Sequence, residues 1–178
     1  LAGVDESART GSRKRFTYRQ LRDRVAKFAG VLRSAGVERG DRVLVYLPMI
    51  PEAIVAMLAC ARIGAVHSVV FGGFAATELA VRIADARPKV VLTASGGLEP
   101  GRAVEYLPIV AKALELAPGS VTTVIVTKRP SVPADIAAYH GRGEATWLDW
   151  RTAEAVATPA EPVAMRSDDP LYVLYTSG

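Results

Sequence analysis

Apolar and polar residues alternate along the chain in blocks whose spacing predicts helices and strands in turn. A mixed opening segment, 1–17, is expected to form a loose hairpin or an edge connection. Thr17 and Gln20 then have the spacing of a capping box, and apolar residues follow at helical spacing as far as Gly36. The run at 42–47, RVLVYL, is rich in residues that favour strands and is typical of a strand buried in a parallel sheet.

The same alternation continues as far as residue 126. Helices are predicted where apolar residues follow Pro51, Thr77 or Leu107 and end near a glycine or a proline. In order, we expect a helix at 51–63, a strand at 66–71, a helix at 77–86, a strand at 89–93, a glycine-rich turn at 95–97, a helix at 107–116 and a strand at 121–126. This pattern favours an α/β fold, with an open, mostly parallel sheet and helices on both faces.

Segment 127–167 interrupts the alternation. Prolines recur along it, and Gly141–Gly143 has the composition of a loop. We expect an irregular excursion that the aromatic residues of Trp147–Trp150 anchor to the core. The sequence shows no internal repeat and no convincing domain boundary, so the chain is interpreted as one domain or part of one.

The last stretch, 168–178, joins an apolar strand to small polar residues. Two adjacent aspartates open it and are interpreted as turn residues ahead of a buried strand at 171–175. Glycine lets the main chain approach a ligand closely, and hydroxyl groups add donors without bulk, a combination suited to polyphosphate. Thr176, Ser177 and Gly178 are therefore a candidate start of a phosphate-binding loop.

Composition and charge argue against several classes of protein. Half of the residues are apolar, and the longest apolar run, 53–61, is too short to span a membrane. Arginines crowd the first 24 residues, but the later ones fall at helical spacing with Asp23 among them and without interleaved aromatic residues, so a solvated face is favoured over a nucleic-acid site. The single cysteine, Cys60, excludes an internal disulfide and a thiol-rich zinc site. We expect a cytoplasmic protein with an inert, buried thiol.

Two loops at strand ends carry further candidate chemistry. In the corner at 71–73, two glycines uncover the backbone and Phe71 offers a base a flat apolar face, although a tight turn with core phenylalanines is the alternative. In the loop at 99–102, Arg102 can direct two donors at a phosphate, although lone loop arginines are more often solvated. No residues have catalytic or metal-ligating spacing, and His67 is expected to be a hydrogen-bonded structural residue.

The tail DDPLYVLYTSG resembles the lead-in to the phosphate loop of the AMP-forming acyl-CoA synthetases, Thr-Ser-Gly-(Ser/Thr)-Thr-Gly-x-Pro-Lys-Gly. Segment 41–76 looks closely like the matching stretch of the short-chain members, which include acetyl- and propionyl-CoA synthetase, and the resemblance extends from Phe16 to Gly178. It implies that residues 1–178 are a fragment of the large N-terminal AMP-binding domain of an adenylate-forming enzyme, without its mobile C-terminal domain.

The resemblance also implies an activity. The whole enzyme would ligate a short-chain acid, propionate or acetate, to coenzyme A through an acyl-AMP intermediate, with ATP and Mg²⁺ as further reactants, and the fragment alone would be inactive. The site residues that it implies are Phe71, Gly72, Gly73, Glu99, Pro100, Gly101 and Arg102 for coenzyme A and Thr176, Ser177 and Gly178 for the ATP phosphates. No catalytic residue and no metal ligand are assigned.

Two departures from the family pattern stand out. Acetate-specific members tend to carry Arg-Ala-Gly-Arg where this chain has Glu99–Arg102, a form closer to the propionyl-CoA branch, and Ala75 replaces a serine that often caps the next helix. Three alternatives remain: a longer-chain acyl-CoA ligase, a peptide-synthetase adenylation domain, or a non-catalytic nucleotide-binding module.

Overall fold

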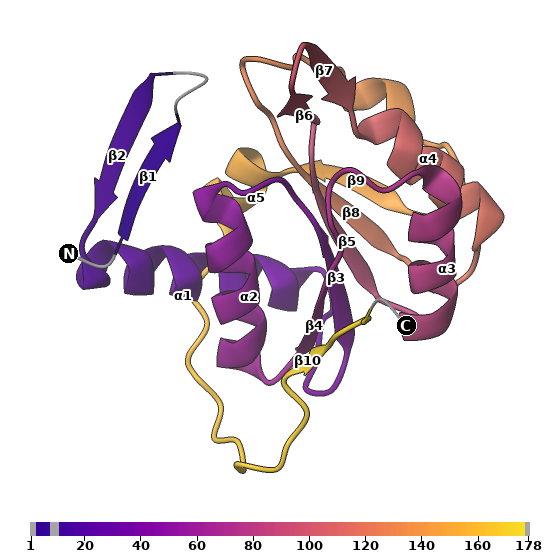
Figure 1. Ribbon diagram of the computed structural model, residues 1–178. Helices are drawn as coiled ribbons and strands as arrows, with labels where there is room; N and C mark the ends of the chain where they lie inside the picture. The colour runs from indigo at the N-terminus through magenta and orange to yellow at the C-terminus, as the bar shows by residue number, and fades with distance from the viewer. Residues whose placement is uncertain (1–2, 8–10, 177–178) are drawn as a thin grey trace.

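A computed structural model describes residues 3–7 and 11–176 of the chain, and Figure 1 shows their arrangement. Its centre is a six-stranded sheet in the order β10-β4-β3-β5-β8-β9. The strands are β3 (Arg42–Tyr46), β4 (Val66–Val69), β5 (Val90–Ala94), β8 (Thr123–Thr127), β9 (Thr146–Asp149) and β10 (Tyr172–Val173). Every neighbouring pair in this sheet runs parallel, which confirms the predicted sheet type.

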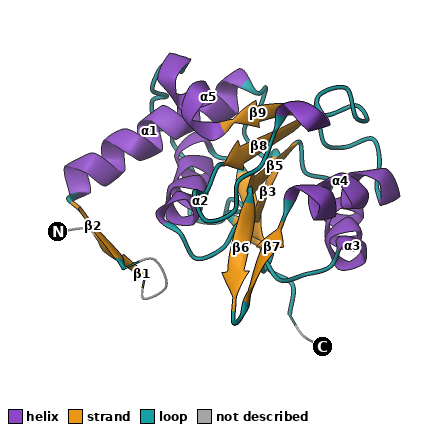
Figure 2. Ribbon diagram, turned by 90° about the horizontal axis from the view of Figure 1, so that it is seen from above, coloured by secondary structure: helices purple, strands orange, loops and turns teal. Residues whose placement is uncertain are grey.

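Helices cover both faces of the sheet, as predicted (Figures 1 and 2). They are α1 (Tyr18–Ser34), α2 (Pro51–Ile63), α3 (Ala76–Ala86), α4 (Leu107–Leu116) and α5 (Trp150–Val156), with a short 3₁₀ turn, η1, at Ala137–Tyr139. The connection from β3 to β4 through α2 steps one way along the sheet, whereas α3 and α4 step the other way. Because crossovers between parallel strands are right-handed, α2 lies on one face and α3 and α4 lie on the other.

The helix boundaries follow local signals in the sequence. The Thr17 N–H donates to Gln20 Oε1 over 2.9 Å and the Gln20 N–H donates to Thr17 Oγ1 over 3.2 Å, so the predicted capping box is present. Pro51 occupies the first turn of α2, and Gly64, with a φ of 71°, ends that helix in the left-handed region.

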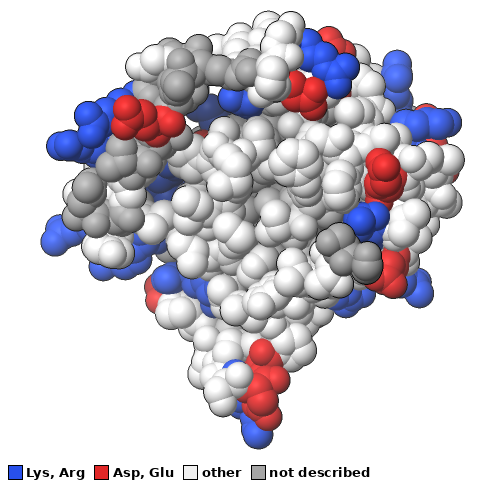
Figure 3. Space-filling model, viewed as in Figure 1, with Lys and Arg blue, Asp and Glu red and all other residues white. Residues whose placement is uncertain are grey.

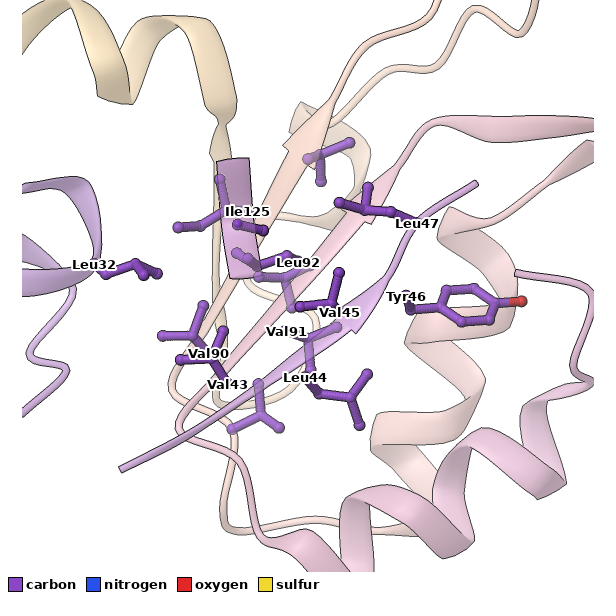
Figure 4. Packing of buried hydrophobic residues seen from close by; sticks show 14 of the residues in the cluster. Leu32, Val43, Leu44, Val45, Tyr46, Leu47, Val90, Val91, Leu92 and Ile125 are labelled. Atoms are coloured by element: carbon purple, nitrogen blue, oxygen red, sulfur yellow. The ribbon is translucent and has the colours of Figure 1, made fainter. Parts of the chain in front are cut away.

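The core lies on both sides of the central strands. In β3, the side chains from Val43 to Tyr46 are all fully buried, which is why this strand reads as a continuous apolar run. Figure 4 shows that Leu32 of α1 approaches the sheet on one side, whereas Tyr46 points to the other. The sheet is thus a buried middle layer.

Two predicted irregular segments contain regular structure. The expected glycine-rich turn at 95–97 is wrong, because β6 (Gly96–Glu99) pairs antiparallel with β7 (Arg102–Glu105) to form a hairpin. The segment at 127–167, expected to be irregular, also contains regular structure in β9 and α5. The predicted anchoring of this segment by the aromatic residues of Trp147–Trp150 is confirmed. Trp147 and Trp150 are each 2% exposed, and the Trp150 ring stacks on Phe28 with a centroid distance of 3.6 Å. The packing of these two rings against the core allows regular structure in this segment despite the prolines around it.

The expectation of a buried strand at 171–175 is also wrong. Only Tyr172–Val173 form a strand, and β10 is an edge strand whose partner among the described residues is β4. Leu171, Tyr172 and Leu174 are exposed because no described helix covers them. In Figure 3 the face over α2 is largely uncharged, with lysine, arginine, aspartate and glutamate gathered toward its rim.

Segment 157–170 forms a strap across α1 and α2. The Ala160 N–H donates to the Ala26 carbonyl over 2.9 Å, and the Arg62 Nε donates to the Ala160 carbonyl over 2.7 Å. A Cβ on Gly30 would collide with the backbone carbonyl oxygen of Thr158, so glycine is required for this close approach. The predicted opening hairpin is present as β1 (Gly3–Ser7) and β2 (Ser12–Phe16).

Candidate functional site

All strands of the six-stranded sheet end at one edge, because they all run parallel. The loops that leave this edge include 70–75 after β4, 95–106 after β5 and 174–176 after β10. The connections from the neighbouring strands β3 and β5 leave toward opposite faces, and open α/β sheets bind ligands at such a switch point. The described residues of the three segments predicted to bind nucleotides, 71–73, 99–102 and Thr176, therefore lie along the edge where such a fold typically binds ligands.

The corner after β4 presents an uncovered aromatic ring. The Phe71 side chain is 72% exposed and meets the Phe74 ring edge-on, with a centroid distance of 6.2 Å. A Cβ on Gly73 would lie 2.7 Å from the Phe71 ring, and a Cβ on Gly72 would lie 2.5 Å from the Tyr106 hydroxyl oxygen. Glycine is therefore needed at position 72, where the buried Tyr106 ring fills the space, whereas a side chain at position 73 would push the exposed Phe71 ring aside. The exposed face of Phe71 is free to stack against a planar ligand.

The segment at 99–102 is the turn of the β6–β7 hairpin. Pro100 and Gly101 occupy the two central positions, and Gly101 has a φ of 81°, as a type II turn requires. At its ends, Arg102 Nε donates to Glu99 Oε2 over 2.9 Å, and Arg102 Nη2 lies 2.8 Å from the same oxygen. The guanidinium is thus presented toward solvent with a carboxylate beside it.

Tyr106 joins the corner to the hairpin. Its hydroxyl occupies the space that a side chain on Gly72 or Gly97 would fill. Its ring packs against Tyr46, with a centroid distance of 4.9 Å, and burial raises the pKa of both phenols. The two neutral tyrosines form a floor under the switch point.

Arg82 joins the corner to the end of the described chain. Its guanidinium carbon lies 4.8 Å from the centroid of the Phe74 ring and 5.4 Å from that of Tyr175. The Tyr175 hydroxyl donates to Asp85 over 2.6 Å, and burial, together with this carboxylate, raises the pKa of Tyr175 to about 12. Thr176 follows directly and is exposed, whereas Ser177 and Gly178 lie outside the described residues.

The structure thus brings the predicted segments to one edge and adds residues that the sequence did not single out. Arg82 and Tyr106 hold the segments together, and Arg129 anchors the hairpin by donating to the Gly96 carbonyl over 3.0 Å. The pair of glycines at 96–97 was the one available signal for a bulky neighbour such as Tyr106. No local signal points to Arg82.

Two hollows reach the same edge, since one is lined in part by Lys128 and Asp149 and the other by Leu47 and Val69. A groove of about 900 Å³ follows β9, and a mostly apolar hollow of about 330 Å³ lies between the β1–β2 hairpin and α2. Neither is lined by residues 71–73 or 99–102. The segments predicted to bind coenzyme A, 71–73 and 99–102, therefore lie on the open surface outside these hollows.

Other candidate residues have structural roles. Burial raises the pKa of the Cys60 thiol to about 12, which fits an inert thiol. The expected hydrogen bond of His67 is not found at Nδ1, which is buried without a partner among the described residues. Asp169 accepts the Arg166 N–H over 2.7 Å, as expected for a turn residue. Across residues 3–7 and 11–176, no cluster of three or more His, Cys, Asp or Glu side chains could hold a metal ion.

Membrane-spanning helices are likewise missing from the described part of the chain, where no helix combines the necessary length and apolar character.

The chain matches known proteins over its whole length. Residues 2–178 match the family model described as AMP-binding enzyme. The human protein named acyl-CoA synthetase short-chain family member 3, mitochondrial, is 46% identical over 178 residues, which are 100% of this chain and 25% of that protein. The acetyl-coenzyme A synthetase of Saccharophagus degradans is 52% identical over 162 residues, covering 91% of this chain and 24% of that protein.

A solved structure is also similar. Acetoacetyl-CoA synthetase from Streptomyces lividans matches with a TM-score of 0.81 and 33% sequence identity, over 95% of this chain and 25% of that chain. The chain therefore spans about a quarter of the length of the curated relatives it matches.

Proposed function

The chain belongs to the AMP-binding enzyme family, and from this premise we propose that the protein of which it forms part ligates a short-chain carboxylic acid to coenzyme A. The names of the similar relatives, which are short-chain acyl-CoA and acetyl-CoA synthetases, support this reaction class. Within that protein, residues 1–178 are proposed to be part of the N-terminal AMP-binding domain. The acyl pocket and the mobile C-terminal domain are proposed to lie in the remainder.

The proposed reaction has two steps, because a carboxylate is a poor acyl donor. Its leaving group would be oxide, so the acid first attacks the α-phosphorus of ATP, forming acyl-AMP and releasing pyrophosphate. Mg²⁺ enters bound to the ATP phosphates, whose charge it offsets. The thiol of coenzyme A then attacks the acyl carbon, AMP leaves, and the thioester forms.

In this proposal the described edge of the sheet supplies part of both nucleotide sites. Phe71 would stack against the adenine of coenzyme A, with Gly72 and Gly73 allowing its close approach, and Arg102 would meet a phosphate. Thr176, with Ser177 and Gly178 beyond it, would begin the ATP phosphate loop. The observation that carries the proposal is the arrangement of Arg82 and Tyr106, which tie all three segments to one edge.

Propionate and acetate are the proposed acids. The Glu99–Arg102 form of the hairpin turn favours propionate, whereas the similarity to an acetyl-coenzyme A synthetase favours acetate. The cytoplasm is the proposed location, since the sequence has a single cysteine and thus no internal disulfide. The human relative is named as mitochondrial, so fractionation of the source cells is the test.

Assay of the purified full-length protein tests the proposed reaction. With ATP, Mg²⁺ and either propionate or acetate, we expect acid-dependent pyrophosphate exchange, followed by thioester formation when coenzyme A is added. A preference for long-chain acids would instead indicate a longer-chain ligase, and exchange with amino acids but no thioester would indicate a peptide-synthetase domain. No exchange with any acid would leave a non-catalytic nucleotide-binding module. The isolated 178-residue piece is expected to show no exchange.

A further inference from the structure

The Arg102 guanidinium is already engaged by a carboxylate of its own hairpin. Its Nε and Nη2 both approach Glu99 Oε2, at 2.9 and 2.8 Å. One edge of the donor fork is therefore occupied, and the Nη1 edge points away from Glu99. The Arg102 side chain is 72% exposed and that of Glu99 is 37% exposed, so the pair lies where a ligand can reach it.

The hairpin fixes this pair before any ligand binds. Glu99 and Arg102 face each other directly across the β6–β7 register. Pro100 sets the backbone of the turn, and Gly101 adopts its positive φ of 81° without strain. The two charged side chains are thus held opposite each other by the backbone, so little further ordering is needed to form the ion pair.

The negative charge of Glu99 also acts on Tyr46 and Tyr106, the two tyrosines that form the floor of the site. Burial is the main cause of the raised pKa of Tyr46 and Tyr106, and the negative charge of Glu99 adds to it at both residues. Glu78 acts in the same direction on Tyr46, whereas Arg129 opposes it at Tyr106. A phosphate arriving at the hairpin therefore meets both an arginine and a competing negative charge.

We propose that Glu99 limits the affinity of the nucleotide site, because its carboxylate competes with the phosphate groups of coenzyme A for the Arg102 guanidinium. This inference rests on the proposed function, and it changes the role of Glu99 from a coenzyme A contact to a rival of the coenzyme A phosphates. A phosphate either displaces Glu99 or binds beside it against like-charge repulsion. The thioester product carries the same phosphates, so the same competition speeds its release.

The test is Glu99→Gln in the full-length protein. Glutamine keeps the size of the side chain and removes its charge, so the KM for coenzyme A is expected to fall by up to about fivefold. Glu115→Gln is the matched control. Glu115 lies on α4, and its Oε2 is 2.9 Å from the Nζ of Lys112, which, like the partner of Glu99, is three residues away in the sequence. The control should leave the KM unchanged. An unchanged or higher KM in Glu99→Gln would overturn the inference.

Pantetheine separates phosphate competition from other effects. It carries the thiol without the nucleotide phosphates, so Glu99→Gln should not change its KM, and an equal fall with both thiols would overturn the inference. Absence of any thioester from the wild-type protein would defeat the proposed function instead. Calorimetric titration with coenzyme A would then test the inference separately, and it is overturned if Glu99→Gln does not bind more tightly than the wild type.

Discussion

The Tyr46 hydroxyl donates a hydrogen bond of 2.8 Å to the carbonyl oxygen of Phe74. Tyr46 ends the central strand β3, and Phe74 closes the glycine corner that follows the neighbouring strand β4. This bond therefore ties the corner to the end of β3 and fixes its position relative to the sheet. It also satisfies a backbone acceptor that no regular ladder reaches.

Tyr46→Phe is expected to destabilise the full-length protein by about 1 to 2 kcal/mol, because the Phe74 carbonyl loses its donor. The corner should loosen as well, raising the KM for coenzyme A. Urea unfolding and steady-state kinetics measure the two effects. Tyr18→Phe on the exposed face of α1 is the matched control, and a loss of stability as large in that variant would contradict the argument.

Arg102→Ala is expected to raise the KM for coenzyme A about tenfold to a hundredfold, since a charge-assisted hydrogen bond contributes about 1.5 to 3 kcal/mol. The contact is remote from the thiol, so kcat should change little. Acid-dependent pyrophosphate exchange reports the ATP half-reaction. If exchange falls as far as thioester formation does, Arg102 supports the fold; if neither changes, it is a solvated arginine.

Ala75→Ser is expected to stabilise the protein by about 0.5 to 2 kcal/mol. Ala75 is the N-cap of α3 and has no side-chain acceptor, although its N–H donates to Glu78 over 2.7 Å. Serine would complete the capping box. Ala84→Ser, at an exposed position within the same helix, should instead cost a few tenths of a kcal/mol. Thermal unfolding compares the two variants, and equal shifts would rule out the cap.

Gly30→Ala separates two opposing effects. Within a helix, alanine is favoured over glycine by about 0.5 to 1 kcal/mol. At Gly30, however, the added methyl group would collide with the Thr158 carbonyl and lift the strap, so we expect a net loss of about 1 to 3 kcal/mol. Urea unfolding gives the sign. A stabilised variant would mean that the strap shifts aside without cost.

Acidification is expected to loosen β10. Burial lowers the pKa of His67 from its usual value, so the folded chain favours the neutral ring. The contribution of the neutral His67 ring to the free energy of unfolding is therefore complete above about pH 6.5. It is lost as the pH falls toward the pKa of His67 in the folded state. The His67 ring lies 5.8 Å from that of Tyr172, which pairs with it in the sheet. The hydrogen-exchange protection factors at β10, which correct for the slower intrinsic exchange at lower pH, should fall between pH 7 and pH 5, and His67→Gln should remove this fall.

Local chemistry accounts for much of what the sequence predicted. Thr17 and Gln20 mark one helix start, Pro51 marks another, and each signal acts within one turn of the chain. The β6–β7 hairpin was missed because its strand glycines serve Tyr106, a neighbour that only the fold brings close. In the same way, α5 depends on the stacking of Trp150 against Phe28, across most of the chain.

In the candidate site, too, local signals predicted the segments but not the contacts that join them. Glycines and small hydroxyl residues after strands indicated the segments at 71–73, 99–102 and 176–178. The residues that join them could not be predicted, because Arg82 meets Tyr175 only once β10 lies beside β4. The pairing of Arg102 with Glu99 likewise required the turn geometry.

The place of β10 at the edge of the sheet bears on the order in which the protein folds. Strands β3, β4 and β5 are joined by single helices, so they can assemble early from contacts that are close in the chain. Strand β10 instead pairs with β4 across more than half of the sequence, and this loop closes only after the intervening segments have been synthesised. On the ribosome, the stem of the candidate phosphate loop is therefore the last of the six described strands to join, and ATP can engage it only after both described helical layers are in place.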